Sequence, residues 1–145
     1  MVPEPFRGGR ILIVDDDRSM VRLLEELLAY AGYQHLRSTS DSRDVVGLCD
    51  DFQPDLILLD LRMPNLDGVQ VLRGLRARRA KAYLPVLVLT ADASRESKRA
   101  ALEAGASDFV TKPFEQIELL LRVRSLIEMR FLHQELHREN QNLET

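Results

Sequence analysis

Two hydrophobic patterns alternate along the chain. Short runs rich in Val, Ile and Leu occur at residues 11–14, 55–60 and 85–89, with less apolar runs at 33–39 and 108–111. Between them, apolar residues recur every three or four positions over residues 18–31, 42–52 and 68–80, a polar and Ala-rich segment covers 94–104, and a helical pattern runs on from residue 115. Short apolar runs predict strands, and the wider spacing predicts helices.

This alternation predicts an α/β fold. Five strands that each precede a helix favour a five-stranded parallel sheet with helices on both faces. Gly32 and Gly105 follow two of the predicted helices, where a glycine commonly ends a helix. In such sheets the ligand lies beyond the carboxyl ends of the strands, so this edge is where we look for chemistry.

Polar residues stand at the carboxyl end of several predicted strands. The first strand ends in Asp15-Asp16-Asp17, the third in Asp60, the fourth in Thr90, and the fifth runs into Lys112-Pro113. Carboxylates about 4 Å apart repel by roughly 4 kcal/mol at an effective dielectric near 20. A hard divalent cation removes that cost, and oxygen ligands favour Mg²⁺ or Mn²⁺. Beside such a metal, a carboxylate can accept a phosphoryl group.

Composition narrows the possible partners and surroundings. The chain has 145 residues, a net charge of -3 and a pI of about 5.6, which argues against a general nucleic-acid surface. No apolar run approaches the length of a membrane span, and the N-terminus has no signal-peptide pattern. The single Cys49 excludes an internal disulfide, and we expect it to be buried. We therefore expect a cytoplasmic protein with no membrane or nucleic-acid partner.

These motifs, taken in order, resemble one family. They are Asp15-Asp16 after ILIV, Asp60 in LLDLRMPNLDG, Thr90 in VLTAD, and Phe109 with Lys112-Pro113 in DFVTKP. The chain is similar over roughly residues 9–128 to the CheY-like receiver domains of two-component response regulators. The resemblance implies a flavodoxin-like sheet, phosphorylation by a sensor histidine kinase or phosphotransfer protein, and no enzymatic turnover of other substrates.

The resemblance also implies a metal set. Asp60 is then the phosphoacceptor and ligates Mg²⁺ (or Mn²⁺) together with Asp16. Asp15 holds the metal through water, and the backbone carbonyl of Arg62 is the third protein ligand. Asp92 and Arg62 lie at positions that tune dephosphorylation in this family.

A second group of residues is implied to act on the phosphoryl group and the switch. Thr90 and Lys112 contact phosphoryl oxygens, and Phe109 stands where the family places a switch aromatic. The Lys112-Pro113 peptide bond is expected to be cis. Phe109 could instead be only a core residue.

Other interpretations of the same residues stay open. Asp17 is better explained as the N-cap of the first helix than as a metal ligand. Asp15-x-Asp17 also resembles the nucleophile motif of haloacid-dehalogenase-type phosphatases, but Arg18-Ser19 departs from that pattern and Asp60 would have no role. His133 and His137 are spaced to bind metal on a helix, but no third ligand is in view.

The C-terminal segment is longer than a receiver domain requires. We expect an N-terminal extension at 1–8, a receiver domain at 9–125 and a signalling helix at 126–145. The helix is similar to linkers that lead to HD-GYP or diguanylate cyclase (GGDEF) output domains. We do not expect a DNA-binding regulator, because only 32 residues follow Pro113 and they have the pattern of one helix. Its heptad frame has Leu126, His133 and Asn140 at a and Met129, Leu136 and Leu143 at d, which predicts a parallel homodimer through 126–143.

Overall fold

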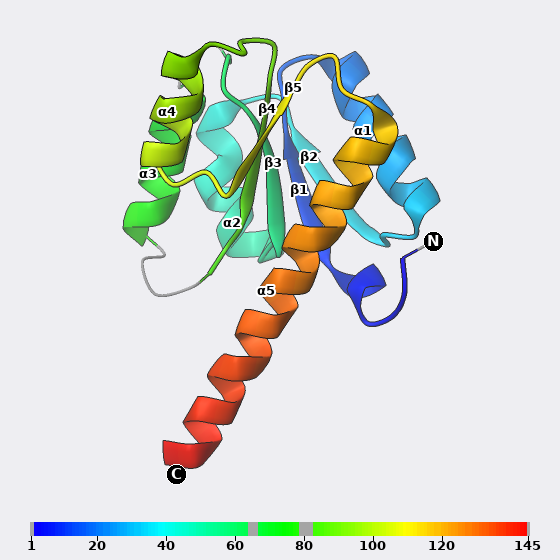
Figure 1. Ribbon diagram of the computed structural model, residues 1–145, viewed down its shortest axis with the longest axis vertical. Coiled ribbons are helices and arrows are strands. Elements are labelled where there is room, and N and C mark those ends of the chain that lie inside the picture. The colour runs from blue at the N-terminus through cyan, green and yellow to red at the C-terminus, as the bar shows by residue number, and fades with distance from the viewer. Residues whose placement is uncertain (1, 64–66, 79–82, 145) are drawn as a thin grey trace.

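The predicted parallel sheet is confirmed. The computed structural model describes residues 2–63, 67–78 and 83–144. Its five parallel strands lie in the order β2-β1-β3-β4-β5 (Figure 1). The strands are β1 (Arg10–Val14), β2 (His35–Thr39), β3 (Leu56–Asp60), β4 (Val86–Thr90) and β5 (Asp108–Thr111). β3 and β4 are buried at every position, whereas β2 lies at the edge and has no fully buried residue, as its weaker apolar pattern predicts.

In the described part of the chain, five α-helices cover both faces of this sheet. They are α1 (Arg18–Ala31), α2 (Val45–Phe52), α3 (Gly68–Arg78), α4 (Arg95–Glu103) and α5 (Gln116–Glu144). One core cluster joins α1 and α5 to the sheet, and a second joins α2, α3 and α4 to the opposite face. Cys49 is buried in the second cluster, as predicted. Among the described residues, no helix combines the length and apolar character needed to span a bilayer.

Local hydrogen bonds explain where the helices begin and end. The Asp17 carboxylate accepts the backbone N–H groups of Ser19 and Met20, so its N-cap role is confirmed. Gly32 ends α1 with a φ of 114°, in the left-handed region that favours glycine. The predicted helix at 42–52 begins with a 3-10 turn at Ser42–Asp44, followed by α2. The last two positions of the predicted helix at 68–80 lie outside the described residues.

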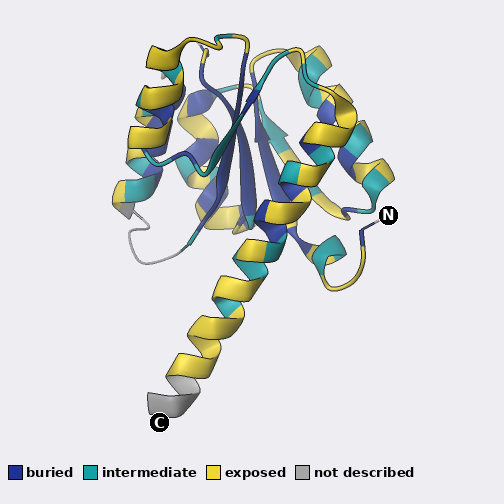
Figure 2. Cartoon of the chain, in the orientation of Figure 1, coloured by how far each residue is buried: buried dark blue, intermediate teal, exposed yellow. Residues whose placement is uncertain are grey.

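α5 has a buried half and an exposed half. Leu119, Val123, Leu126 and Ile127 are buried against the sheet, and beyond them the helix projects away from the domain and becomes mainly exposed (Figure 2). Leu126 therefore lies in the core of its own chain and is not available to a partner helix. The predicted division at residue 125 stays a prediction, but apolar packing continues past it.

Candidate functional site

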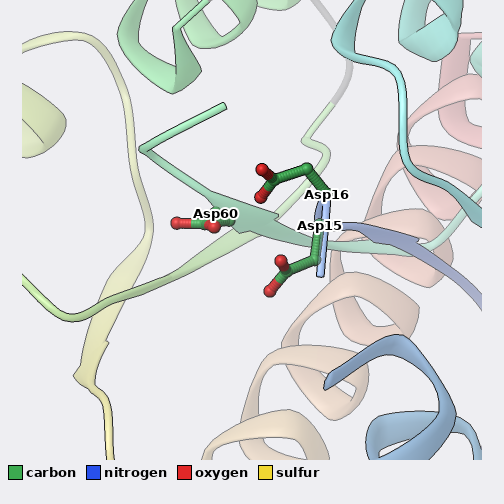
Figure 3. Close-up of side chains that lie close together, drawn as sticks. All are labelled: Asp15, Asp16 and Asp60. Atoms are coloured by element: carbon green, nitrogen blue, oxygen red, sulfur yellow. The ribbon is translucent and has the colours of Figure 1, made fainter. Parts of the chain in front are cut away.

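The predicted acidic residues meet at one edge of the sheet. Asp15 and Asp16 follow β1, and Asp60 is the last residue of β3, the neighbouring parallel strand. Figure 3 shows their three carboxylates gathered at the carboxyl ends of these strands, and one oxygen of each lies within 4.8 Å of the others. Asp15 and Asp60 are buried, whereas Asp16 is exposed. The sequence prediction that these three side chains meet is therefore confirmed.

Lys112 supplies the positive charge at this edge. Its Nζ lies 2.7 Å from Oδ2 of Asp15 and 3.5 Å from Oδ2 of Asp60. The Lys112 side chain is 15% exposed and that of Asp15 only 3% exposed, so solvent screens this pair weakly. Three carboxylates and one ammonium leave this cluster with an excess of negative charge.

The surroundings of Asp60 shift the pKa of its carboxyl group. Burial raises the pKa of the Asp60 carboxyl above its ordinary value. A hydrogen bond from the backbone N–H of Arg62 to Oδ1, at 3.1 Å, and the charge of Lys112 both oppose this rise in pKa. The neighbouring charges of Asp15 and Asp16 add to it. A cation beside the cluster would favour the ionised, nucleophilic form of Asp60.

Close backbone packing holds Asp60 and Asp15 in place. The N–H of Asp17 donates to Oδ1 of Asp15 at 2.9 Å. The N–H of Gly68, at the start of α3, donates to the Leu61 carbonyl at 2.8 Å. A Cβ at Gly68 would lie 2.8 Å from the Asp60 carbonyl oxygen and 2.5 Å from Leu61 Cα, so only glycine fits there. The importance of Gly68 was missed because Asp67-Gly68 resembles an ordinary turn.

Thr90 lies at the end of β4, next to β3. It is fully buried, and its hydroxyl oxygen accepts the N–H of Asp92 at 3.2 Å. Within the described ranges, no acceptor takes the hydroxyl proton of Thr90. The backbone carbonyl of Thr90 accepts the N–H of Lys112 at 2.8 Å, so β4 and the segment after β5 are joined at this edge. The peptide bond between Lys112 and Pro113 is cis, as predicted.

A charged pair forms the outer rim of the site. Arg62 and Asp92 make an ion pair of 2.9 Å, although the Arg62 side chain is 71% exposed. A hydrogen bond from the Ser97 hydroxyl, with others from Ser94 and Arg62, holds the pKa of the Asp92 carboxyl well below its usual range. Asp92 therefore ties Arg62 to the start of α4. Ser94 and Ser97 were not identified from the sequence.

Phe109 lies in β5 and is partly buried. Its ring packs against the cluster formed by α2, α3 and α4. Lys98 of α4 places its ammonium 5.5 Å from the ring centroid, a cation–π contact that no sequence pattern indicated. Phe109 thus lies between the core and solvent, and its predicted switch role stays a prediction.

The donor set fits a hard cation. In the part of the chain that the structure describes, Asp15, Asp16 and Asp60 are the one group of three possible ligands close enough to hold a metal ion. Oxygen ligands of this kind suit Mg²⁺ or Mn²⁺. The Arg62 carbonyl as a further ligand stays a prediction. His133 instead stacks on Tyr83, with ring centroids 4.2 Å apart.

Comparison with known proteins places the chain beside one family. The family model for the response regulator receiver domain matches residues 11–124 of this chain. Response regulator MprA of Mycolicibacterium vanbaalenii is 43% identical over 118 residues, 81% of this chain and 50% of that protein. Response regulator PleD of Caulobacter vibrioides is 40% identical over 129 residues, 89% of this chain and 28% of that protein. The chain thus spans half or less of the length of these relatives.

A solved structure has the same fold. The receiver domain of Francisella response regulator 1452 superimposes with a TM-score of 0.77 and is 30% identical. The match covers 84% of this chain and 98% of that one.

Proposed function

The chain belongs to the response regulator receiver domain family of two-component signalling, and on this premise we propose that Asp60 accepts a phosphoryl group and thereby switches the domain. The observation that carries this proposal is the burial of Asp60 beside Asp15, Asp16 and Lys112 at the carboxyl end of a central strand. The donor is a phosphohistidine of a sensor kinase or of a phosphotransfer protein.

A divalent metal completes the proposed site. Asp16, Asp60 and the carbonyl of Arg62 would hold Mg²⁺ (or Mn²⁺), with Asp15 acting through water. When bound, the ion neutralises charge on the carboxylates and on the phosphoryl oxygens. The cluster's excess negative charge supports this proposal, because a dianionic donor would otherwise be repelled.

Each residue then has a definite task in the transfer. An oxygen of Asp60 attacks phosphorus, and the bond from phosphorus to the donor's imidazole nitrogen breaks. The imidazole takes up one proton from water and leaves as the neutral base. Lys112 binds one phosphoryl oxygen, as its position 3.5 Å from Asp60 allows. Positioning and charge neutralisation supply most of the catalysis in such transfers.

The switch uses the neighbouring strand. A phosphoryl oxygen on Asp60 offers an acceptor for the proton of the Thr90 hydroxyl. Movement of Thr90 toward it frees space for the Phe109 ring, which leaves its contact with Lys98. α4 presents few buried side chains, Ala101 being the one buried residue described in it, so little apolar packing resists this movement.

We extend the proposal to partners and location. The chain acts in the cytoplasm, catalyses only its own phosphorylation and dephosphorylation, and relays its state to an output domain of the HD-GYP or GGDEF class or to a separate partner. Exposed Met129, Leu132 and Leu136 support a homodimer through α5, although the paired segment would begin after Leu126.

Acetyl phosphate with Mg²⁺ tests the acceptor. We expect intact-mass spectrometry to show one added phosphoryl group on the wild type and on Asp51→Ala, which removes an exposed carboxylate of α2. We expect none on Asp60→Ala or in the presence of EDTA. An adduct of equal yield on Asp60→Ala would show that Asp60 is not the acceptor. Steady turnover of small phosphate esters would instead favour the phosphatase interpretation.

A further inference from the structure

Arg130 of α5 lies near the amino-terminal ends of β3 and β4, which we call the base of the sheet. The acidic cluster lies at the opposite, carboxyl-terminal ends of the strands. Its Nε is 3.3 Å from Oδ1 of Asp55, and its guanidinium also donates to the backbone carbonyl of Tyr83. The Arg130 and Asp55 side chains are each only 13% exposed. One guanidinium therefore bridges two segments that lie far apart in the sequence.

Both segments lead directly into central strands. Asp55 immediately precedes β3, and its second carboxylate oxygen accepts the N–H of Arg10 at 2.9 Å. Tyr83 lies three residues before β4, its ring stacks on His133, and its hydroxyl is 3.7 Å from the sulfur of Met129. The segment before β4 thus contacts two successive turns of α5 at the point where the helix leaves the domain (Figure 1).

The opposite ends of these two strands carry the proposed chemistry. β3 ends in Asp60 and β4 ends in Thr90, and the two strands pair directly, with Asp60 beside Leu89. Arg130 therefore joins the base ends of the two strands whose other ends hold the phosphoacceptor and the switch hydroxyl. A small shift of β4 against β3 changes the separation of the two acceptors that Arg130 holds.

We infer that Arg130 is a positioning residue that couples the phosphorylation state of Asp60 to the part of α5 beyond residue 131. The inference rests on the proposed function. A guanidinium suits this role because its planar fork holds two acceptors in a fixed geometry, which a single ammonium cannot do. Such coupling is reciprocal, so the position of α5 also affects the equilibrium at Asp60.

Hydrogen exchange with beryllofluoride and Mg²⁺ tests this coupling. Exchange is followed in residues 90–112, which report the switch, and in 131–140, which report the α5 extension. The proteins are the wild type, Arg130→Lys, Arg130→Gln and Arg138→Gln, the last removing an exposed arginine from the same helix. Arg130→Lys retains the charge and loses only the fork, so the test does not depend on tolerating an unpaired Asp55.

We expect residues 90–112 to respond to beryllofluoride in all four proteins. Residues 131–140 should respond in the wild type and in Arg138→Gln, and the response should be lost in both Arg130 variants. The coupling inference fails if residues 131–140 respond undiminished in Arg130→Lys and Arg130→Gln, or if they do not respond in the wild type. Neither result would contradict the proposed phosphorylation of Asp60. If beryllofluoride binds the wild type but not at Asp60, the proposed function fails and the inference fails with it.

Discussion

Asp60→Asn should stabilise the folded chain when no metal is present. One carboxylate oxygen from each of Asp15, Asp16 and Asp60 lies within 4.8 Å of the other two. Two like charges about 4.8 Å apart repel by about 3.5 kcal/mol at an effective dielectric near 20. Asp60 therefore meets about 7 kcal/mol of repulsion from the other two carboxylates. Lys112, whose Nζ is 3.5 Å away, offsets about 5 kcal/mol of this on the same basis.

The difference predicts a gain of about 2 kcal/mol in the free energy of unfolding. Asparagine is nearly the same size, its oxygen can still accept the N–H of Arg62, and its amide can donate to the remaining carboxylates. For a chain of this length, 1 kcal/mol corresponds to about 4 °C in melting temperature, so a rise of about 8 °C is expected in EDTA at pH 7. Thermal unfolding of both proteins measures it, with the exposed Asp51→Asn as control.

The pH dependence of this gain has a definite sign. Because burial raises the pKa of Asp60 above its ordinary value of 3.8, the folded chain binds this proton more tightly than the unfolded chain does. The stabilisation from that proton is fully present below pH 3.8 and is lost as pH rises through the raised pKa. The advantage of Asp60→Asn should therefore be smallest in acid and should grow toward neutral pH.

Added Mg²⁺ should reduce the difference in melting temperature between Asp60→Asn and the wild type, because an ion bound by the folded cluster stabilises the wild type by mass action. If Asp60→Asn melts at or below the wild-type temperature in EDTA at pH 7, repulsion among the three carboxylates does not destabilise the folded chain. A gain that is the same at every pH would show that repulsion at Asp60 is not its cause.

Two further variants test the switch and the assembly. Thr90→Ala should keep phosphorylation of Asp60 but lose the beryllofluoride response of amide exchange in residues 90–112. The control Thr111→Ala, on the paired strand, should keep both. A response in Thr90→Ala equal to that of the wild type would exclude the proposed role of the Thr90 hydroxyl. Leu136→Glu should convert a dimer that phosphorylation strengthens into a monomer, as measured by sedimentation equilibrium, whereas Gln134→Glu should not; monomers in every sample would exclude the dimer.

The carboxyl edge of the sheet could be predicted because topology and chemistry act together there. Once the alternating patterns specify parallel strands, the residues that follow each strand must meet at one edge. Asp15, Asp60 and Lys112 were predicted to meet on this basis, and they do. The roles within this group depend on the family resemblance, since spacing alone does not distinguish a metal ligand from a phosphoacceptor.

The rim contacts could not be predicted because they depend on side-chain conformations. Arg62 and Asp92 are 30 residues apart, and nothing in either segment indicates that they pair. Lys98 is one of several charged residues on a polar helix, and only the packing of α4 against β5 brings it over Phe109. The heptad frame also placed Leu126 at the dimer interface, although this side chain packs in the core of its own domain. Sequence alone does not distinguish the two, because an apolar residue on a helix can face its own domain or a partner.

The contact between Arg130 and Asp55 at the base of the sheet could not be predicted from the sequence either, and its loss would have a functional consequence. Asp55 and Arg130 lie 75 residues apart, and neither belongs to a recognisable motif. Arg130 also lies beyond residues 11–124, the part matched by the family model. A receiver cut after residue 125 would lose the buried Leu126 and Ile127 and leave Asp55 without its guanidinium. The acceptor site of such a fragment would be complete, yet the contact that we propose transmits its state would be missing. Phosphorylation and signal output should therefore be separable by changes at the base of the sheet, far from Asp60.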